Sequence, residues 1–152
     1  MERVWNKKLE SKPRCFIENI EEIELEKTII FPKMYVGLML LQNGGYLDKD
    51  SFEYLDVYRS ETIGECAMFL SIGHYSMGRF YETVEQYLSD PPEFFHENLI
   101  PFAENGGGNL VCFDYRSTKE EPPIVFWCHD DNEGEDVHFV ANSFEEFLNM
   151  LQ

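Results

Sequence analysis

The stretch that decides the fold is "PFAENGGGNLVCFDYR", residues 101–116, where three consecutive glycines precede an alternating apolar run. A P-loop would require G-x-x-x-x-G-K-[ST] followed by a helix, and this stretch has neither the lysine nor the helix. A dinucleotide site would require glycines that open a helix, whereas these glycines open a strand. We therefore interpret Gly106 to Gly108 as a tight turn between two strands, with a positive φ at one or more glycines.

The sequence around this turn predicts several short strands. Residues 99–105 form the strand before the glycines, and the turns that follow are rich in Pro, Asp and Glu. Further upstream, two β-prone runs are separated by a turn that we place near Gly64. Besides 99–105, the predicted strands are residues 52–58, 65–72, 109–115, 124–128 and 137–141.

Helical periodicity appears mainly in the first third of the chain. "FIENIEEIELEK", residues 16–27, places its apolar residues on one helical face. A second helix begins near Pro32 and stops at Asn43-Gly44-Gly45, where glycine can take a left-handed capping conformation. The apolar face of the first helix consists of Phe16, Ile17, Ile20 and Ile23.

Two further helices are predicted in the second half of the chain. "SMGRFYETVEQYLSDPP", residues 76–92, buries a stripe and ends at two prolines. In "NSFEEFLNMLQ", residues 142–152, Ser143 and Glu146 form a capping box. The buried stripe of the first of these helices is Phe80, Val84, Tyr87 and Leu88, and that of the second is Phe144, Phe147, Leu148 and Leu151.

The order of these elements predicts an α+β fold. Helices cluster first, strands follow and a helix closes the chain, which favours a mainly antiparallel sheet with helices packed on one face. The 152 residues suit a single domain, and no repeat or long linker divides them. We expect a basic N-terminal arm at residues 1–15 and one domain at residues 16–152.

The charge of the chain restricts its partners. The net charge is -17, and five of the twelve basic residues lie within the first fourteen positions. Nucleic acids and anionic membranes are bound through Lys and Arg, so both are disfavoured as partners. A basic protein would be attracted, although acidity that serves only solubility explains the charge equally well.

Cysteine usage and hydropathy indicate a cytoplasmic protein. The four cysteines are widely spaced, form no CxxC motif and lie in or beside apolar runs, where a free thiol acts as a small hydrophobe. The N-terminus is charged and lacks the apolar core of a signal peptide. No apolar run approaches the roughly 20 residues of a membrane span.

The densest run of carboxylates is "CHDDNEGEDVH", residues 128–138. A calcium loop that starts at Asp130 would put Gly134 at a ligand position, and His129 and His138 miss the local zinc spacing. The first interpretation is a solvated hairpin turn, and the alternatives are a partner-facing acidic patch and weak metal binding.

No local signature of catalysis is present, since the chain lacks a G-x-S-x-G elbow and a reactive-cysteine context. We therefore predict a protein that is not an enzyme, with no catalytic, cofactor-binding or metal-ligating residues. In "PPEFFHENLIPF", Phe94 and Phe95 are adjacent and cannot easily share one face, so one of them is a candidate partner anchor and packing is the alternative.

Four motifs in order resemble the SUKH superfamily, specifically its Smi/Knr branch. They are "LLQNGG" (40–45), "LIPFAENGGGNLVCFDYR" (99–116), "PPIVFWCHDDNE" (122–133) and "VANSFEEFLNML" (140–151). The resemblance begins near residue 16 and is loose over residues 51–98. The positions that match family motifs are Asn43, Gly44, Gly45, Gly106 to Gly108, Asp114, Val125, Trp127, Ser143 and Phe144.

The resemblance implies a function as well as a fold. Bacterial members of this superfamily look like immunity proteins that bind and neutralise toxins, often nucleases, and this chain resembles a bacillus-type antitoxin for an LXG-class toxin. Eukaryotic relatives are regulatory scaffolds of cell-wall synthesis, and they usually carry long disordered flanks. An interaction scaffold or cell-wall regulator is therefore the alternative to the immunity function. The family has no recognised catalytic set to carry over.

The function predicted from the sequence is therefore the stoichiometric binding of a cognate toxin, with a basic nuclease domain as the expected partner. An acidic inhibitor complements such a nuclease, because nucleases hold phosphates with basic residues. The predicted partner-binding residues are Asp130, Asp131, Glu133, Glu135, Asp136, Phe94 and Phe95.

Overall fold

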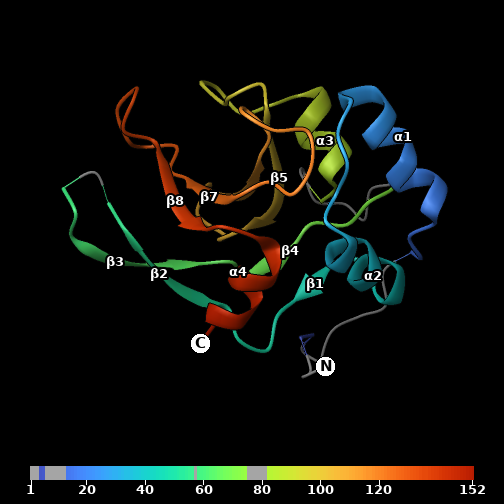
Figure 1. Ribbon diagram of the computed structural model, residues 1–152, viewed down its shortest axis with the longest axis horizontal. Coiled ribbons are helices and arrows are strands. Elements are labelled where there is room, and N and C mark those ends of the chain that lie inside the picture. Colours follow the sequence, from blue (N-terminus) through green and yellow to red (C-terminus); the bar gives the residue numbers. More distant parts are fainter. Residues whose placement is uncertain (1–3, 6–12, 57, 75–81) are drawn as a thin grey trace.

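The computed structural model describes residues 4–5, 13–56, 58–74 and 82–152 (Figure 1). A six-stranded antiparallel sheet with the order β1-β4-β5-β6-β7-β8 forms the centre, and β2 and β3 form a separate two-stranded sheet. The strands are β1 (Gly45–Tyr46), β2 (Ser51–Leu55), β3 (Glu61–Glu65), β4 (Met68–Phe69), β5 (Leu99–Glu104), β6 (Leu110–Asp114), β7 (Ile124–Trp127) and β8 (Val137–Ala141). The helices within the described residues are α1 (Ile17–Lys27), α2 (Lys33–Leu41), α3 (Val84–Ser89) and α4 (Phe144–Met150). The predicted α+β class is confirmed.

The triple glycine is a tight turn between β5 and β6, as predicted. Gly106 and Gly108 have φ values of 85° and 99°, which side chains other than glycine rarely adopt. The Asn105 side-chain oxygen accepts hydrogen bonds from the backbone nitrogens of Gly107 and Asn109 at 2.8 and 3.0 Å. The turn therefore uses its glycines to reverse the chain, and Asn105 satisfies its backbone donors.

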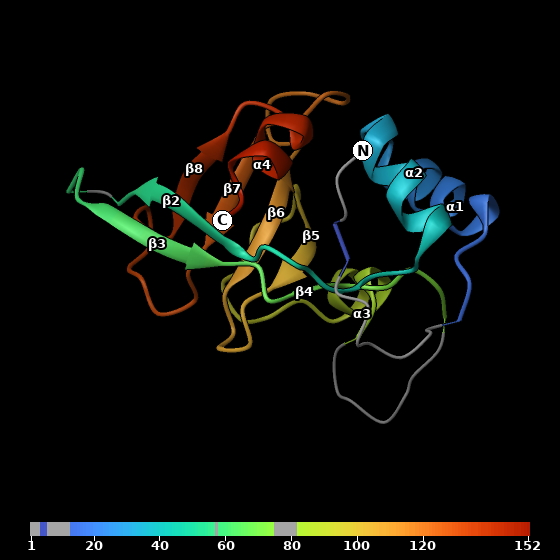
Figure 2. The same cartoon turned by 90° about the horizontal axis from the view of Figure 1, so that it is seen from below.

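One face of the sheet is covered by aromatic side chains from two helices. Phe102 on β5 and Phe113 on β6 stack with ring centroids 4.3 Å apart. Tyr35 of α2 and Phe144 of α4 pack edge-on against Phe102, at 6.0 and 5.6 Å. Figures 1 and 2 show α1 lying beside α2 at the end of the molecule away from the β2–β3 hairpin. These rings bury the apolar area that holds the helices on the sheet.

The β2–β3 hairpin differs from the prediction. Strands were expected at residues 52–58 and 65–72 with a turn near Gly64, but Gly64 lies inside β3, opposite Phe52 of β2. The turn instead follows Asp56, whose Oδ1 accepts hydrogen bonds from the backbone nitrogens of Tyr58 and Ser60, both at 2.9 Å. A side chain rather than a glycine makes this turn, and the predicted turn position is wrong.

The predicted helices are present, with three differences in detail. The predicted helix at 76–92 is wrong at residues 82–83, because Thr83 is an extended N-cap and α3 begins at Val84. Helix α1 buries Ile20 and Ile23 as expected, whereas Phe16 and Ile17 are exposed because Phe16 precedes the helix and Ile17 only begins it. Helix α2 ends at Gln42 in an extended conformation, so glycine does not provide its C-cap. The first part of the predicted helix at 76–92, with Phe80, lies outside the described residues.

The last two helices begin at hydroxyl caps. Thr83 accepts a hydrogen bond from the backbone nitrogen of Gln86 at the start of α3, at 3.2 Å. Ser143 accepts from the backbone nitrogen of Glu146 at 3.1 Å, as expected for α4, while the Glu146 carboxylate accepts from Asn142. Each cap satisfies a backbone donor that would otherwise lack a partner.

The predicted N-terminal arm is mostly outside the described residues. Trp5 is described, forms a β-bridge to Leu47 and packs edge-on against Phe69 with ring centroids 5.4 Å apart. Cys15 is buried. The chain is therefore held against the domain at these two points, and the division into an arm at residues 1–15 and a domain at residues 16–152 stays a prediction.

Gly44 is required by a close approach of two backbone segments. Its φ is 80°, and a Cβ at this position would lie 2.7 Å from the carbonyl oxygen of Phe69. Gly37, in the middle of α2, has no neighbouring atom within 4 Å of a Cβ built on it. Substitution of these two glycines by alanine is therefore expected to change the stability of the fold in opposite directions.

We predict that Gly44→Ala lowers the free energy of unfolding by about 2 kcal/mol or more, because it adds backbone strain and a clash with main-chain atoms. Gly37→Ala should raise it by about 0.5–1 kcal/mol, because alanine loses less entropy in a helix. Urea unfolding followed by circular dichroism measures both values. Equal effects of the two substitutions would contradict the backbone approach at Gly44.

Candidate functional site

The acidic run forms the hairpin connection between β7 and β8, as the first interpretation of the sequence expected. We call residues 128–136 the acidic loop. The backbone nitrogen of Cys128 donates to the carbonyl of Asp136 at 2.9 Å, and that of Glu135 donates to the carbonyl of Asn132 at 2.9 Å. Asp130, Asp131 and Glu133 are exposed and Glu135 is half-buried, so these carboxylates face solvent on an ordered loop.

Asp136 differs from the other four acidic residues of the predicted site. It is only 7% exposed, and its Oδ2 accepts a hydrogen bond from the indole nitrogen of Trp127 at 3.0 Å. The same oxygen lies 2.9 Å from Nε2 of His96. Burial alone would raise the pKa of Asp136, but the hydrogen bonds from His96 and Trp127 outweigh burial and hold that pKa below its usual value. Asp136 thus anchors the end of the acidic loop to the segment around His96.

The two phenylalanines of the predicted site are placed differently, which the sequence had left open. Phe95 packs edge-on against Trp127, with ring centroids 4.9 Å apart. Phe94 is 80% exposed and has a φ of 67°. The backbone nitrogen of Phe95 donates to the carbonyl of Pro92 at 3.1 Å, so Phe94 occupies the third position of a tight turn. A positive φ at this turn position is normally met by glycine, so an exposed phenylalanine is held there with backbone strain.

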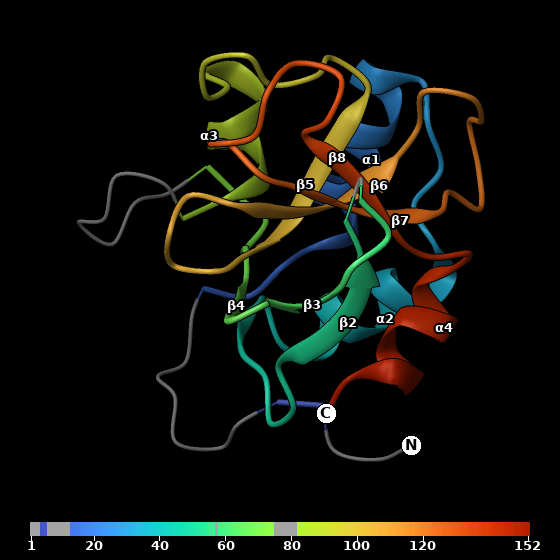
Figure 3. The same cartoon turned by 90° about the vertical axis from the view of Figure 1, so that its left-hand side faces the viewer.

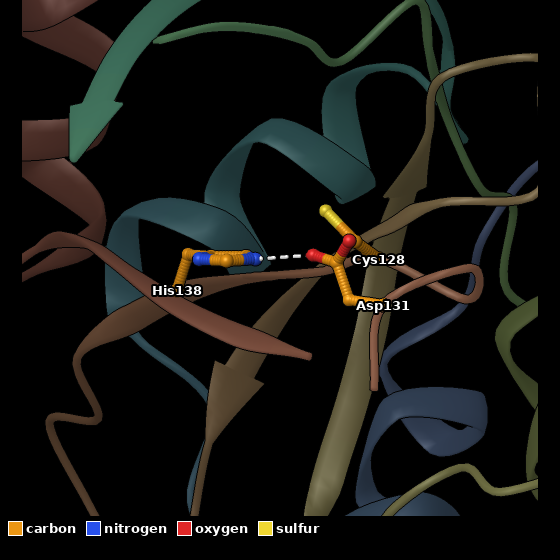
Figure 4. A group of neighbouring side chains, drawn as sticks. All are labelled: Cys128, Asp131 and His138. Atoms are coloured by element: carbon orange, nitrogen blue, oxygen red, sulfur yellow. Dashed lines mark hydrogen bonds and ion pairs between the residues drawn. The ribbon is translucent and has the colours of Figure 1, made fainter. Parts of the chain in front are cut away.

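Three side chains at the base of the acidic loop converge in a way that the sequence did not reveal. Ligand atoms of Cys128, Asp131 and His138 all lie within 4.8 Å of one another (Figure 4). His138 is buried, its Nε2 is 2.8 Å from the Asp131 carboxylate, and its ring lies 5.2 Å from that of Tyr54 on β2. All three residues lie in the run 128–138, but their spacing matches no metal-site pattern, and only the pairing of β7 with β8 brings Cys128 and His138 together.

The chemistry of this group is that of a hydrogen-bonded cluster in which Cys128 and His138 are buried and Asp131 is exposed. Cysteine, histidine and aspartate are all zinc ligands, but structural zinc sites take four protein ligands, and the group found among the described residues supplies three. Burial and the charge of Asp131 raise the pKa of the Cys128 thiol to about 12, so the sulfur is protonated at neutral pH. A protonated thiol is a weak nucleophile. The cluster ties the acidic loop to β8 and to Tyr54.

The acidic loop does not stand alone at the surface. Its residues Asp130, Asp131 and Glu135 line a hollow of about 190 Å³ together with Asp56 and Tyr58 from the β2–β3 turn. Sequence reasoning did not include Asp56 or Tyr58, because the turn between β2 and β3 was expected elsewhere. The fold therefore places the carboxylate of Asp56 beside three carboxylates of the predicted site, those of Asp130, Asp131 and Glu135.

The fold and this surface define an α+β domain with an anchored acidic hairpin loop. The chain belongs to the SMI1 / KNR4 family (SUKH-1), whose family model matches residues 15–150. It is also similar to the SPbeta prophage-derived uncharacterized protein YokK of Bacillus subtilis (strain 168), with 28% identity over 142 residues, which cover 86% of this chain and 71% of that protein. No solved structure matches the chain. Among the described residues, none of the helices has the length and apolar character needed to cross a bilayer.

We predict that Phe94→Gly raises the free energy of unfolding by about 1 kcal/mol, because glycine takes the positive φ of this turn position without strain. The exposed ring makes few contacts that its removal would cost. Thermal and urea unfolding of the variant and the parent protein measure the difference. A loss of stability of similar size would show that the ring of Phe94 packs more than its exposure indicates.

We predict that Asp136→Asn lowers the free energy of unfolding by about 1–2 kcal/mol at pH 7, because it removes a charge that accepts two buried hydrogen bonds. Since the pKa of Asp136 is lowered in the folded state, its stabilisation is present above the unfolded pKa of about 3.9 and is lost as the pH falls through the folded value.

The free-energy difference between the parent and Asp136→Asn should therefore shrink as urea unfolding is repeated at pH values falling from about 5 to the folded pKa. Asp130→Asn is the matched control, because Asp130 is exposed on the same loop and should leave the pH profile unchanged. A difference that stays constant across this pH range would argue against the depressed pKa of Asp136.

Proposed function

We propose that this protein is an immunity protein that binds a cognate toxin stoichiometrically and neutralises it. The observation that carries the proposal is the acidic loop, which holds exposed carboxylates on a backbone anchored by the buried Asp136. Membership of the SUKH family supports it, because that family includes immunity proteins. The buried anchor means that the charges are presented in a fixed arrangement, which favours recognition of a specific partner.

The proposed partner is a basic protein domain, and a nuclease of an LXG-class toxin is the partner that the family resemblance implies. Nucleases hold phosphates with Lys and Arg, so their active-site surfaces are positively charged. A chain of net charge -17 would associate quickly with such a surface in the cytoplasm, where the toxin would otherwise act.

The proposed action needs no turnover. Burial raises the pKa of the Cys15 thiol to about 11 and that of Cys128 to about 12, and it raises the pKa values of Cys66 and Cys112 as well. Thiols with raised pKa values are poorly suited to nucleophilic catalysis at neutral pH. The chemistry of the cysteines thus supports a protein that acts by occupying its partner.

We predict that the triple variant Asp130→Lys, Glu133→Lys and Glu135→Lys loses protection against the toxin. Any toxin that is found encoded beside this gene is co-expressed with the parent or the variant, and cell survival is scored. With the purified toxin, the association rate at low salt should fall at least about tenfold and lose most of its salt dependence, because the steering charges are reversed.

The matched control is Glu18→Lys, Glu21→Lys and Glu26→Lys on α1, which changes the net charge equally at another exposed surface. This control should still protect cells and keep a salt-dependent association rate. Equal losses in both variants would mean that only overall charge matters, and survival with the loop variant would remove the acidic loop from the proposed interface.

A further inference from the structure

A groove lies beside the acidic loop, between the β2–β3 hairpin and β8. Figures 1 and 3 show the hairpin projecting next to β8, the last strand of the large sheet. The groove has a volume of about 530 Å³. Its apolar lining comes from Tyr54, Leu55, Phe139 and Val140, and its polar lining from Glu53, Arg59 and Glu61.

The groove leaves large apolar side chains in contact with water. Phe139 on β8 is 54% exposed and Leu55 on β2 is 52% exposed. Ile63 on the neighbouring strand β3 is 69% exposed and pairs with Glu53. Apolar side chains gathered beside a groove and rimmed by charges are typical of a surface that a partner covers.

The groove and the acidic hollow share one wall. The end of β2 contributes Leu55 to the groove, and the β2–β3 turn contributes Arg59 to the groove and Asp56 and Tyr58 to the hollow beside the acidic loop. Taken together, the linings contain six carboxylates and one guanidinium. An occupant must therefore combine an apolar side chain for the groove with positive charge for the hollow.

This joint surface is held in shape before any partner arrives. Asp56 fixes the turn through its two backbone hydrogen bonds at 2.9 Å. Tyr54 packs on the ring of His138, with ring centroids 5.2 Å apart, so β2 is attached to the base of the acidic loop. A surface that needs little reordering loses less affinity on binding.

The geometry points to this joint surface as the docking site for one segment of the toxin, with an aliphatic or aromatic side chain in the groove and an adjacent Lys or Arg in the acidic hollow. The inference rests on the proposed function and names where and how the toxin is held. A second copy of this chain is a poorer occupant, because it would bring a net charge of -17 to a negative surface. The carboxylates promote encounter, and the groove supplies the apolar burial that slows dissociation.

A peptide titration tests the surface without the toxin. A nine-residue peptide of alternating Leu and Arg is added to isotope-labelled protein, and backbone amide shifts are followed by NMR. Shifts concentrated at Tyr54, Leu55, Phe139 and the acidic loop support the inference. The matched peptide with Glu in place of Arg should cause no saturating shifts there. Saturation on another surface, or no binding of the Arg peptide, overturns the inference.

A pair of variants tests the apolar part of the surface. Phe139→Asp should raise the Kd of the Arg peptide at least tenfold, while Leu25→Asp, at an exposed position on α1, should leave it unchanged. If Phe139→Asp fails to fold by circular dichroism, Leu55→Asp replaces it with the same expectation, because Leu55 also lines the groove and is 52% exposed. Unchanged affinity in the folded groove variant overturns the inference.

The toxin experiment then separates the two proposals. A neighbouring toxin that is neutralised equally by the parent and by the folded groove variant contradicts the docking site and leaves the immunity function standing. Failure of the parent protein to protect against any neighbouring toxin contradicts the immunity function, whereas the peptide titration still decides whether the surface binds a basic apolar segment.

Discussion

The buried amide of Asn43 is the constraint on which the arrangement of the domain depends. Its Nδ2 donates to the carbonyls of Pro13 and Ile72 at 2.7 and 2.8 Å, and its Oδ1 accepts from the backbone nitrogen of Ile72 at 2.7 Å. The Ser71 hydroxyl donates to the Asn43 carbonyl at 2.7 Å. One side chain thus joins three distant parts of the chain, and an isosteric carboxylate could not supply the two donated bonds. A buried amide that lacks hydrogen-bond partners costs free energy. The hydrogen bonds of Asn43 therefore favour the one arrangement of the end of α2 against the segment after β4 in which all of them form.

The acidic surface depends on a second buried polar group, Asp136. Four like charges on one loop repel one another, and a loop held only by its two strands could relieve that repulsion by moving apart. The bonds from Trp127 and His96 to Asp136 oppose such movement at the C-terminal end of the loop, and the pair of His138 and Asp131 opposes it near the base. The loop can therefore carry several exposed charges close together, because its buried carboxylate, Asp136, is held by hydrogen bonds.

Much of the fold followed from the sequence, and the failures have identifiable causes. The strand at residues 137–141, the turn at the triple glycine and the Ser143 cap were all predicted, because alternation, glycine and capping are local signals. The β2–β3 hairpin was misplaced because Gly64 looked like a turn residue. Its position in fact makes room for the ring of Phe52, since a Cβ there would lie 2.5 Å from that ring. The partners of Asp136 and His138 could not be predicted, because they depend on the pairing of β7 with β8 and on the path of residues 91–98.

Several departures from good local design lie around the groove and the acidic hollow. Phe139 on β8 and Ile63 on β3 leave large apolar side chains in water. Six carboxylates meet around the neighbouring hollow and groove against one guanidinium. Each feature lowers the stability of the isolated protein, and none is needed to form the sheet or its aromatic core. Exposed apolar area and like charge would both be relieved by a partner that is apolar and positive at the same time, so the same physical features that weaken the free domain would strengthen its complex.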